Sequence, residues 1–359
     1  MPEAKHEVLV LYGGRSTEHE VSCRSANFIL RNLDPKRFDV KAIGIDKEGS
    51  WWPQDTAKLL AAVPGPVAIV RQASGPVPPG SLGFQAAASP PVVFPVLHGS
   101  FGEDGTMQGL LELSGVPFVG PDTLGSAIGM DKVVSKRLAQ AAGVPVVPWL
   151  DVRAQHWTKR GEALCARALT ELGLPLFVKP ARLGSSVGVS KVKTAAELIP
   201  ACIEALAFDD RIMIEKGLNV REIEVACLGD YDPALSVPGE VIAHADFYSY
   251  DAKYLDAAGS SVQVPAHLES SQVKVAQQMA RQVFVGLELY GMARVDLFLE
   301  KGSGDFYFNE VNTIPGFTEI SQYPQLWAAS GVDAQVLLTR LVDLALQRHL
   351  TKRSLRRSK

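Results

Sequence analysis

Three polar side chains stand out because they lie within two apolar segments near the C-terminus. Asp296 lies in MARVDLFLE, and Glu310 and Asn312 lie in DFYFNEVNT. Glu310 and Asn312 are two residues apart, so on a strand they point to the same face. Carboxylate and amide oxygens on neighbouring strands suit a hard cation such as Mg²⁺, usually shared with substrate phosphates. A solvated polar face is the alternative, but unpaired carboxylates are costly to bury, which favours the metal site.

A second segment, LFVKPARLGSSVGVSKV, has the features of a phosphate-binding loop. Lys179 ends an apolar strand, and the loop from Gly184 to Gly188 would expose backbone N–H groups beside the hydroxyls of Ser185 and Ser186. The segment does not fit G-x-x-x-x-G-K-[ST], which disfavours a P-loop ATPase. Taken alone, it is better interpreted as a flexible loop.

The segment MIEKGL ends another predicted strand with Glu215 and Lys216, followed by Leu218. Such a strand end can offer a carboxylate and backbone groups to the edge of an adenine ring. It can equally be an edge strand that ends in charges. Both interpretations stay open on these residues alone.

Two further polar residues follow strands in the N-terminal third. Glu18, in GGRSTEHEVS, lies at the mouth of the first sheet, where ligands bind in open α/β folds. The dinucleotide-binding pattern G-x-G-x-x-G is absent. His98, in VLHGSFGEDG, is on its own better explained as a hydrogen-bonded loop histidine than as a catalyst.

The elements that must position these residues alternate between strand and helix. EVLVLYGG, FDVKAIGID, PVVFPVLHG and PFVG are predicted strands, and GTMQGLLELSG is a predicted helix. A helix after the first strand is expected to begin at a capping box formed by Thr17 and Glu20. This pattern predicts an open parallel sheet flanked by helices over residues 1–125, with a proline-rich surface loop between Pro64 and Pro91.

The rest of the chain divides into two further units, at residues 126–218 and 219–359. DKVVSKRLAQAAGVP and EALCARALTELGLP are predicted helices, each followed by a short strand. From REIEVACLG onward, strands surround one long helix over ESSQVKVAQQMARQVFVGLEL. The pattern therefore divides the chain into three predicted units, and its 359 residues favour two or three domains over one.

Composition excludes several classes of protein. The chain is 47% hydrophobic and 21% charged with a formal net charge of −3, which is typical of a globular protein that does not bind nucleic acid or an anionic membrane. No apolar run is long enough to span a bilayer, and the first residues do not resemble a signal peptide, so a cytoplasmic protein is expected. Cysteines 23, 165, 202 and 227 are widely spaced, which predicts buried reduced thiols.

Eight segments together resemble the D-alanine:D-alanine ligases of the ATP-grasp superfamily. They are, in chain order, LYGGRSTEHEVS, VLHGSFGEDGTMQG, MDK, VKPARLGSSVGVSKV, EKGL, YDAKYL, MARVDLFLE and FNEVNTIPGFTEIS. The resemblance implies a three-domain ATP-grasp fold with ATP between the central and C-terminal domains. It also implies that ATP phosphorylates one D-alanine, and that the amine of a second attacks this acyl phosphate to form the peptidoglycan dipeptide.

The resemblance also assigns expected roles residue by residue. The catalytic residues would be Glu18, Ser185, Tyr254, Arg294 and Gly316. The substrate-binding residues would be His98 and Ser321. The ATP-binding residues would be Lys132, Lys179, Glu215, Lys216, Leu218, Glu222 and Phe247. The ligands of two Mg²⁺ or Mn²⁺ ions would be Asp296, Glu310 and Asn312.

Within this set, Glu18 would meet the ammonium group of the first D-alanine and Ser321 the carboxylate of the second. Arg294 and the N–H of Gly316 would face the oxyanion of the tetrahedral intermediate. Ser185 and Tyr254, with Glu18, would latch a lid over the site.

Two rival functions are weighed against this one. A ligase joining D-alanine to D-lactate or D-serine would differ at the lid, where Tyr254 favours D-alanine as the acceptor. A nucleotide-binding protein without ligase activity would not need Arg294 or Ser321. A homodimer is expected from the resemblance alone.

Overall fold

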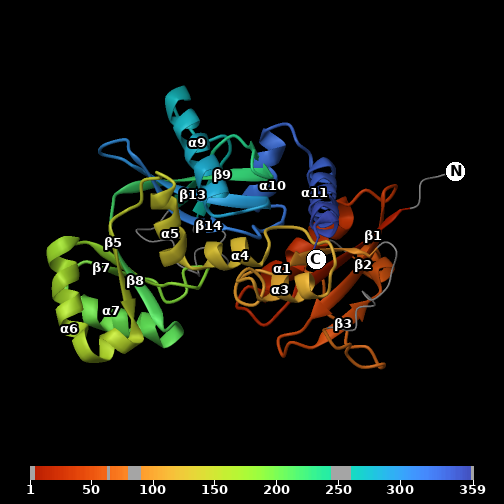
Figure 1. Cartoon of the computed structure of the whole chain (residues 1–359), viewed down its shortest axis with the longest axis horizontal. Coiled ribbons are helices and arrows are strands. Elements are labelled where there is room, and N and C mark those ends of the chain that lie inside the picture. Colours follow the sequence, from red (N-terminus) through yellow and green to blue (C-terminus); the bar gives the residue numbers. More distant parts are fainter. Residues whose placement is uncertain (1–4, 63–64, 80–89, 244–259, 357–359) are drawn as a thin grey trace.

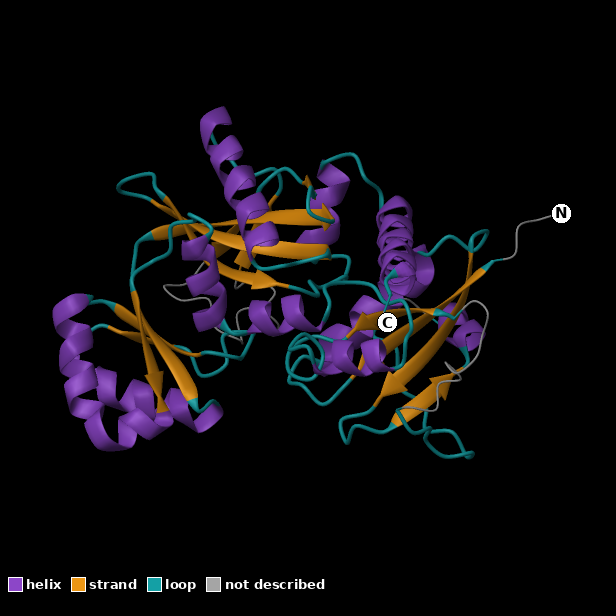
Figure 2. Ribbon diagram, viewed as in Figure 1, coloured by secondary structure: helices purple, strands orange, loops and turns teal. Residues whose placement is uncertain are grey.

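The computed structural model describes residues 5–62, 65–79, 90–243 and 260–356, and arranges them in three sheets with helices packed around them (Figure 2). The expected α/β fold is therefore confirmed. Among the described residues, no helix is both long and apolar enough to cross a membrane. All four cysteines are buried and free, as predicted.

The N-terminal sheet has the strand order β3-β2-β1-β4. Its strands are β1 (His6–Gly13), β2 (Phe38–Ile45), β3 (Trp51–Gln54) and β4 (Val92–Val96). β1 pairs in parallel with β2 and β4, as expected, but β3 is antiparallel to β2 and was not predicted. The strand predicted at PFVG is only a single bridge between Val93 and Phe118. Its helices are α1 (His19–Asn32), α2 (Thr56–Ala61) and α3 (Thr106–Leu113).

The start of α1 differs from the prediction. Glu18 occupies the N-cap position, and no side chain caps the helix. The capping-box prediction is wrong because the carboxylate of Glu20 instead accepts a hydrogen bond from Lys47. Glu18 is consequently positioned by the start of α1, directly after the loop that follows β1.

The central sheet has the strand order β5-β8-β6-β7, and all of its pairs are antiparallel. Its strands are β5 (Trp149–Arg153), β6 (Leu176–Pro180), β7 (Ser190–Val192) and β8 (Arg211–Lys216). Helices α6 (Ala154–Glu171) and α7 (Ala195–Phe208) pack against it and enclose a core that includes Cys165 and Cys202. Figure 1 shows this unit as a separate lobe at the left.

The C-terminal sheet has the strand order β12-β11-β9-β13-β14, with β10 also paired to β9. Its strands are β9 (Val220–Gly229), β10 (Ala234–Leu235), β11 (Gly239–Ala243), β12 (Ser260–Gln263), β13 (Gly291–Glu300) and β14 (Phe306–Asn312). The long helix α9 (Ser270–Gly286) packs on β9, β13 and β14, and β14 also carries α4 (Thr123–Met130) and α5 (Lys132–Ala141). The helices α4 and α5 thus link the N-terminal sheet to the C-terminal one (Figure 1).

The last two helices lie between the C-terminal and N-terminal sheets: the first packs on β9, and the second packs on β4 and α1 as well as on β9 and β13. These helices are α10 (Gln322–Ala329) and α11 (Ala334–Ser354). One continuous core contains Phe94 of β4, Ile29 of α1 and Leu341 of α11. Arg348 of α11 donates to the carbonyls of Phe118 and Gly120 and lies between the rings of Phe118 and Tyr290.

Candidate active site

The predicted metal ligands lie together on two paired strands. Asp296 of β13 faces Glu310 of β14, and Arg294 faces Asn312. Asn312 donates its amide N–H to Asp296 at 2.9 Å, so its other amide atom is an oxygen acceptor. Among the described residues, no group of three or more His, Cys, Asp or Glu could hold a metal ion. A cation here would therefore need oxygens from bound phosphates and water as well.

Arg294 is fixed between two carboxylates of the same sheet. Its guanidinium donates two hydrogen bonds of 2.7 Å to Asp296 and lies 3.3 Å from Glu224. Burial alone would lower the pKa of Arg294, but the charges of Asp296 and Glu224 outweigh burial and raise it. The group is thus a permanently charged, rigidly oriented donor.

Lys132 connects the loop after β6 to β14, the strand that carries two of the predicted metal ligands. It is the first residue of α5, and Asp131 caps that helix by accepting from the N–H groups of Val133 and Val134. Its ammonium group lies 3.1 Å from Glu310 and donates to the carbonyl of Leu183, in the loop after β6. One cation therefore contacts both Glu310, a predicted metal ligand on β14, and the residue just before the predicted phosphate loop.

Lys179 and Glu215 belong to a buried ion cluster that the sequence did not predict. Glu215 is 1% exposed, and its two carboxylate oxygens each lie 2.6 Å from an ammonium nitrogen, one of Lys136 and one of Lys179. Burial raises the pKa of Glu215, but the two lysines outweigh it and the net shift is downward. The carboxylate that was expected to meet adenine is therefore engaged by two ammonium groups.

The loop after β6 meets α1 through Ser185 and Glu18. The hydroxyl of Ser185 donates to a carboxylate oxygen of Glu18 at 2.6 Å, across 167 positions of sequence. Ser185 and Ser186 both have positive φ, at 53° and 58°, a conformation that non-glycine residues adopt at a cost. A loop held in this conformation by a contact between two domains is a candidate functional element. The contact between Ser185 and Glu18 agrees with the predicted latch, whose third member, Tyr254, lies outside the described residues.

His98 is held by hydrogen bonds at both ring nitrogens. Nε2 lies 3.0 Å from Ser25 Oγ, and Nδ1 lies 2.9 Å from the carbonyl oxygen of Ile314. A carbonyl can only accept, so Nδ1 carries the proton and Nε2 accepts from Ser25. Ser25 Oγ in turn accepts from the N–H of Phe317. Burial lowers the pKa of His98 despite the nearby charge of Glu18, which agrees with a neutral ring that anchors the turn after β14.

That turn carries Gly316 and leads to Ser321. Ser321 Oγ accepts from the N–H of Thr318, and a methyl group at Gly316 would lie only 2.7 Å from this oxygen. Glycine is therefore the residue that lets the turn fold over Ser321. Ser321 also occupies the N-cap position of α10.

Glu103 is a site residue that the sequence did not single out. Its carboxylate accepts from the N–H groups of Gly99, at 2.7 Å, and Ile314, at 3.0 Å. Burial and the charge of Glu18 raise the pKa of Glu103 to about 8. Its place in GEDG, at the end of the segment VLHGSFGEDG that contains His98, was the only available signal.

The remaining predicted ATP-binding residues lie at the junction of the central and C-terminal sheets. Lys216 is the exposed last residue of β8, and its N–H donates to Pro148. Leu218 lies between β8 and β9, and Glu222 on β9 faces Phe298 of β13. Phe247 lies outside the described residues.

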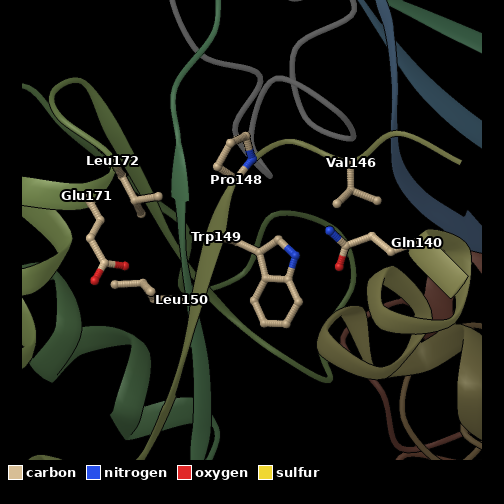
Figure 3. Close-up of a pocket in the computed structure, with 7 residues that line it drawn as sticks. All are labelled: Gln140, Val146, Pro148, Trp149, Leu150, Glu171 and Leu172. Atoms are coloured by element: carbon tan, nitrogen blue, oxygen red, sulfur yellow. The ribbon is translucent and has the colours of Figure 1, made fainter.

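A hollow of about 410 Å³ lies near this junction but contains none of the predicted site residues. Figure 3 shows that α5, β5, α6 and the segment before β5 line it. The lining residues are Gln140, Val146, Pro148, Trp149, Leu150, Glu171 and Leu172. The candidate site is instead the set of charged side chains that α1, α5, β6, β8, β13 and β14 bring together.

Comparison with known proteins agrees with this geometry. Residues 7–121 match the family described as D-ala D-ala ligase N-terminus, and residues 138–343 match D-ala D-ala ligase C-terminus. The chain belongs to the D-alanine–D-alanine ligase family. The expected family and its ATP-grasp fold are therefore confirmed.

Relatives in this ligase family match nearly the whole chain. A D-alanine–D-alanine ligase A of Bradyrhizobium diazoefficiens is 47% identical over 98% of this chain and 98% of its own length. A D-alanine–D-alanine ligase of Heliobacterium modesticaldum is 43% identical over 97% of this chain and 96% of its own length.

Solved structures of the family superpose closely on this one. The D-alanine-D-alanine ligase from Coxiella burnetii has a TM-score of 0.81 and 36% identity, covering 98% of this chain and 96% of its own. The VanG D-Ala:D-Ser ligase from Enterococcus faecalis has a TM-score of 0.81 and 34% identity, covering 95% of this chain and 100% of its own. The backbone is thus shared by ligases with different acceptors.

Proposed function

We propose that this chain uses ATP to join two D-alanine molecules through a D-alanyl phosphate, and so supplies the peptidoglycan dipeptide in the cytoplasm. The observation that carries the proposal is the contact of Lys132 with both Glu310 and the loop after β6. This contact brings a predicted metal ligand and the predicted phosphate loop close to the ammonium group of Lys132. A homodimer is part of the proposal and would be checked by light scattering.

The first step transfers the γ-phosphoryl group of ATP to the carboxylate of one D-alanine and releases ADP. Such a transfer depends on positioning and on cations around the phosphates more than on an acid or base. Lys132 and Lys179 would supply two of these cations. Asp296, Glu310 and Asn312 offer the hard oxygen donors that Mg²⁺ or Mn²⁺ accepts, and such ions would neutralise charge on the phosphates.

In the second step the amine of the other D-alanine attacks the carbonyl carbon, and phosphate leaves. Negative charge develops on the carbonyl oxygen, so rigid donors aimed at it lower the barrier. Arg294, oriented by Asp296 and Glu224, and the N–H of Gly316 would serve as these donors. Ser321 would bind the acceptor carboxylate, and His98 would hold the turn that carries Gly316.

Replacing Ser185 by alanine is expected to uncouple the two steps. The variant loses one hydrogen bond to the charged Glu18, worth roughly 1.5 to 3 kcal/mol, so the closed site would be populated about ten- to a hundredfold less. Water would then hydrolyse the acyl phosphate more often. The measurement is the ratio of phosphate to dipeptide at saturating ATP and D-alanine.

Ser303→Ala is the matched control, because that hydroxyl also donates to a glutamate, Glu300, but in an exposed turn. Its ratio should stay at the wild-type value. An unchanged ratio in Ser185→Ala as well would show that this hydroxyl does not close the site.

The acceptor decides between the proposed reaction and its rivals. Purified protein is expected to release phosphate and form dipeptide with D-alanine alone. When D-lactate or D-serine is added at equal concentration, it should form much less of the mixed product than of D-alanyl-D-alanine. Preferred use of D-serine or D-lactate would establish one of the rival ligases. ATP binding without turnover that depends on D-alanine would establish a nucleotide-binding protein.

A further inference from the structure

Lys136 is a buried cation to which the proposed reaction gives no role. It lies on α5, one helical turn after Lys132, and is 0% exposed. Its ammonium nitrogen lies 2.6 Å from Glu215 and donates to the carbonyl of Phe308 at 3.0 Å. Lysine is almost never fully buried unless it is paired, so its place in the cluster needs an explanation.

The cluster as a whole carries one excess positive charge. Glu215 is its single carboxylate, and it pairs with both Lys136 and Lys179. Lys136 is completely enclosed, whereas the side chain of Lys179 is 11% exposed. Of the two lysines, only Lys179 can therefore present charge to a bound polyphosphate. Lys136 shares the single negative charge of Glu215 with Lys179, so that net positive charge remains at Lys179.

We propose that Lys136 is a positioning residue for ATP: it neutralises Glu215, so that the ammonium group of Lys179 stays available to the phosphates. This inference rests on the proposed role of Lys179. Lys136 also donates a hydrogen bond to the carbonyl of Phe308, which lies on β14 two residues before Glu310. Lys136 thus joins β8, which carries Glu215, to the strand that carries a predicted metal ligand.

Lys136→Met tests the inference, because methionine fills similar space without charge. Glu215 then has Lys179 as its only ammonium partner in the cluster, whose net charge falls to zero. The affinity for ATP should drop on the order of tenfold, since the interaction of charges at a partly buried site is only weakly screened. The affinity for adenosine, which has no phosphate, should change less than about twofold. A general distortion of the site would instead weaken the binding of both ligands.

The double variant Lys136→Met/Glu215→Gln restores the excess positive charge and should recover most of the lost ATP affinity. Dissociation constants for ATP and adenosine would be measured by calorimetry on the full chain, with thermal unfolding recorded for each variant. Equal losses for both ligands, or no recovery in the double variant, would overturn the inference. A Lys136→Met protein that does not fold, and that Glu215→Gln does not restore, would also overturn it, because the lysine would then serve the fold alone.

Lys179→Met separates failure of this inference from failure of the proposed site. If Lys179→Met binds ATP as tightly as wild type, the assignment of Lys179 to the phosphates is wrong. If Lys179→Met weakens ATP binding but Lys136→Met does not, the site stands and the positioning role of Lys136 is wrong.

Discussion

Replacing Glu310 by glutamine is expected to lower the rate of dipeptide formation by at least about a hundredfold while the protein remains folded. The substitution keeps the size of the side chain but removes the charge that would help to hold the metal ions. It also removes the partner of Lys132, 3.1 Å away. The measurement is kcat at several Mg²⁺ concentrations, together with the midpoint of thermal unfolding.

Glu300→Gln is the control for this prediction. Glu300 is the last residue of β13 and carries no predicted role. Its kcat should stay within about twofold of wild type, as expected for a surface substitution away from the site. If Glu310→Gln reaches a near-normal kcat at saturating Mg²⁺, Glu310 does not hold the metal.

Arg294→Lys is expected to lower kcat by roughly a hundred- to a thousandfold, the loss that follows removal of one donor from an oxyanion site. Lysine keeps the charge but cannot reproduce the two parallel hydrogen bonds to Asp296. A misplaced donor would slow attack on the acyl phosphate, so dipeptide formation should fall further than ATP consumption. Both rates would be measured in the same reaction.

Arg221→Lys offers a closely matched control on the neighbouring strand β9. Arg221 also makes two hydrogen bonds to one carboxylate, that of Glu240, but it carries no predicted role in the site. Arg221→Lys should therefore change stability more than kcat. A kcat for Arg294→Lys that matches that of Arg221→Lys would remove Arg294 from the reaction.

Strands and their charged residues could be predicted where the pattern of apolar and polar residues lies within one short segment of sequence. Asp296 and Glu310 interrupt apolar runs with a clear strand character, and the structure pairs them directly. The short edge strand β3 escaped prediction because WWPQ contains a proline, which is uncommon inside sheets. The capping box failed because Glu20 had a competing partner, Lys47, on a distant segment.

Lys136 could not have been predicted for the same reason. Within KVVSKRLAQA it has the sequence context of any surface lysine on an amphipathic helix. Its burial depends on Glu215 of the central sheet and Phe308 of the C-terminal sheet. The roles that the family resemblance assigned to Tyr254 and Phe247 fall on residues outside those described, and they stay predictions.

The packing of α11 on the N-terminal sheet has a consequence for how the chain is made. The core that contains Ile29 and Phe94 is completed by Leu341 and its neighbours on the last helix. A ribosome releases β1 and α1 first and α11 last, so the part of this core that α11 covers stays exposed until synthesis ends. Contacts between such distant segments form slowly because a long loop must close. The N-terminal third therefore exposes apolar side chains of this core, which chaperones recognise, until α11 has been made.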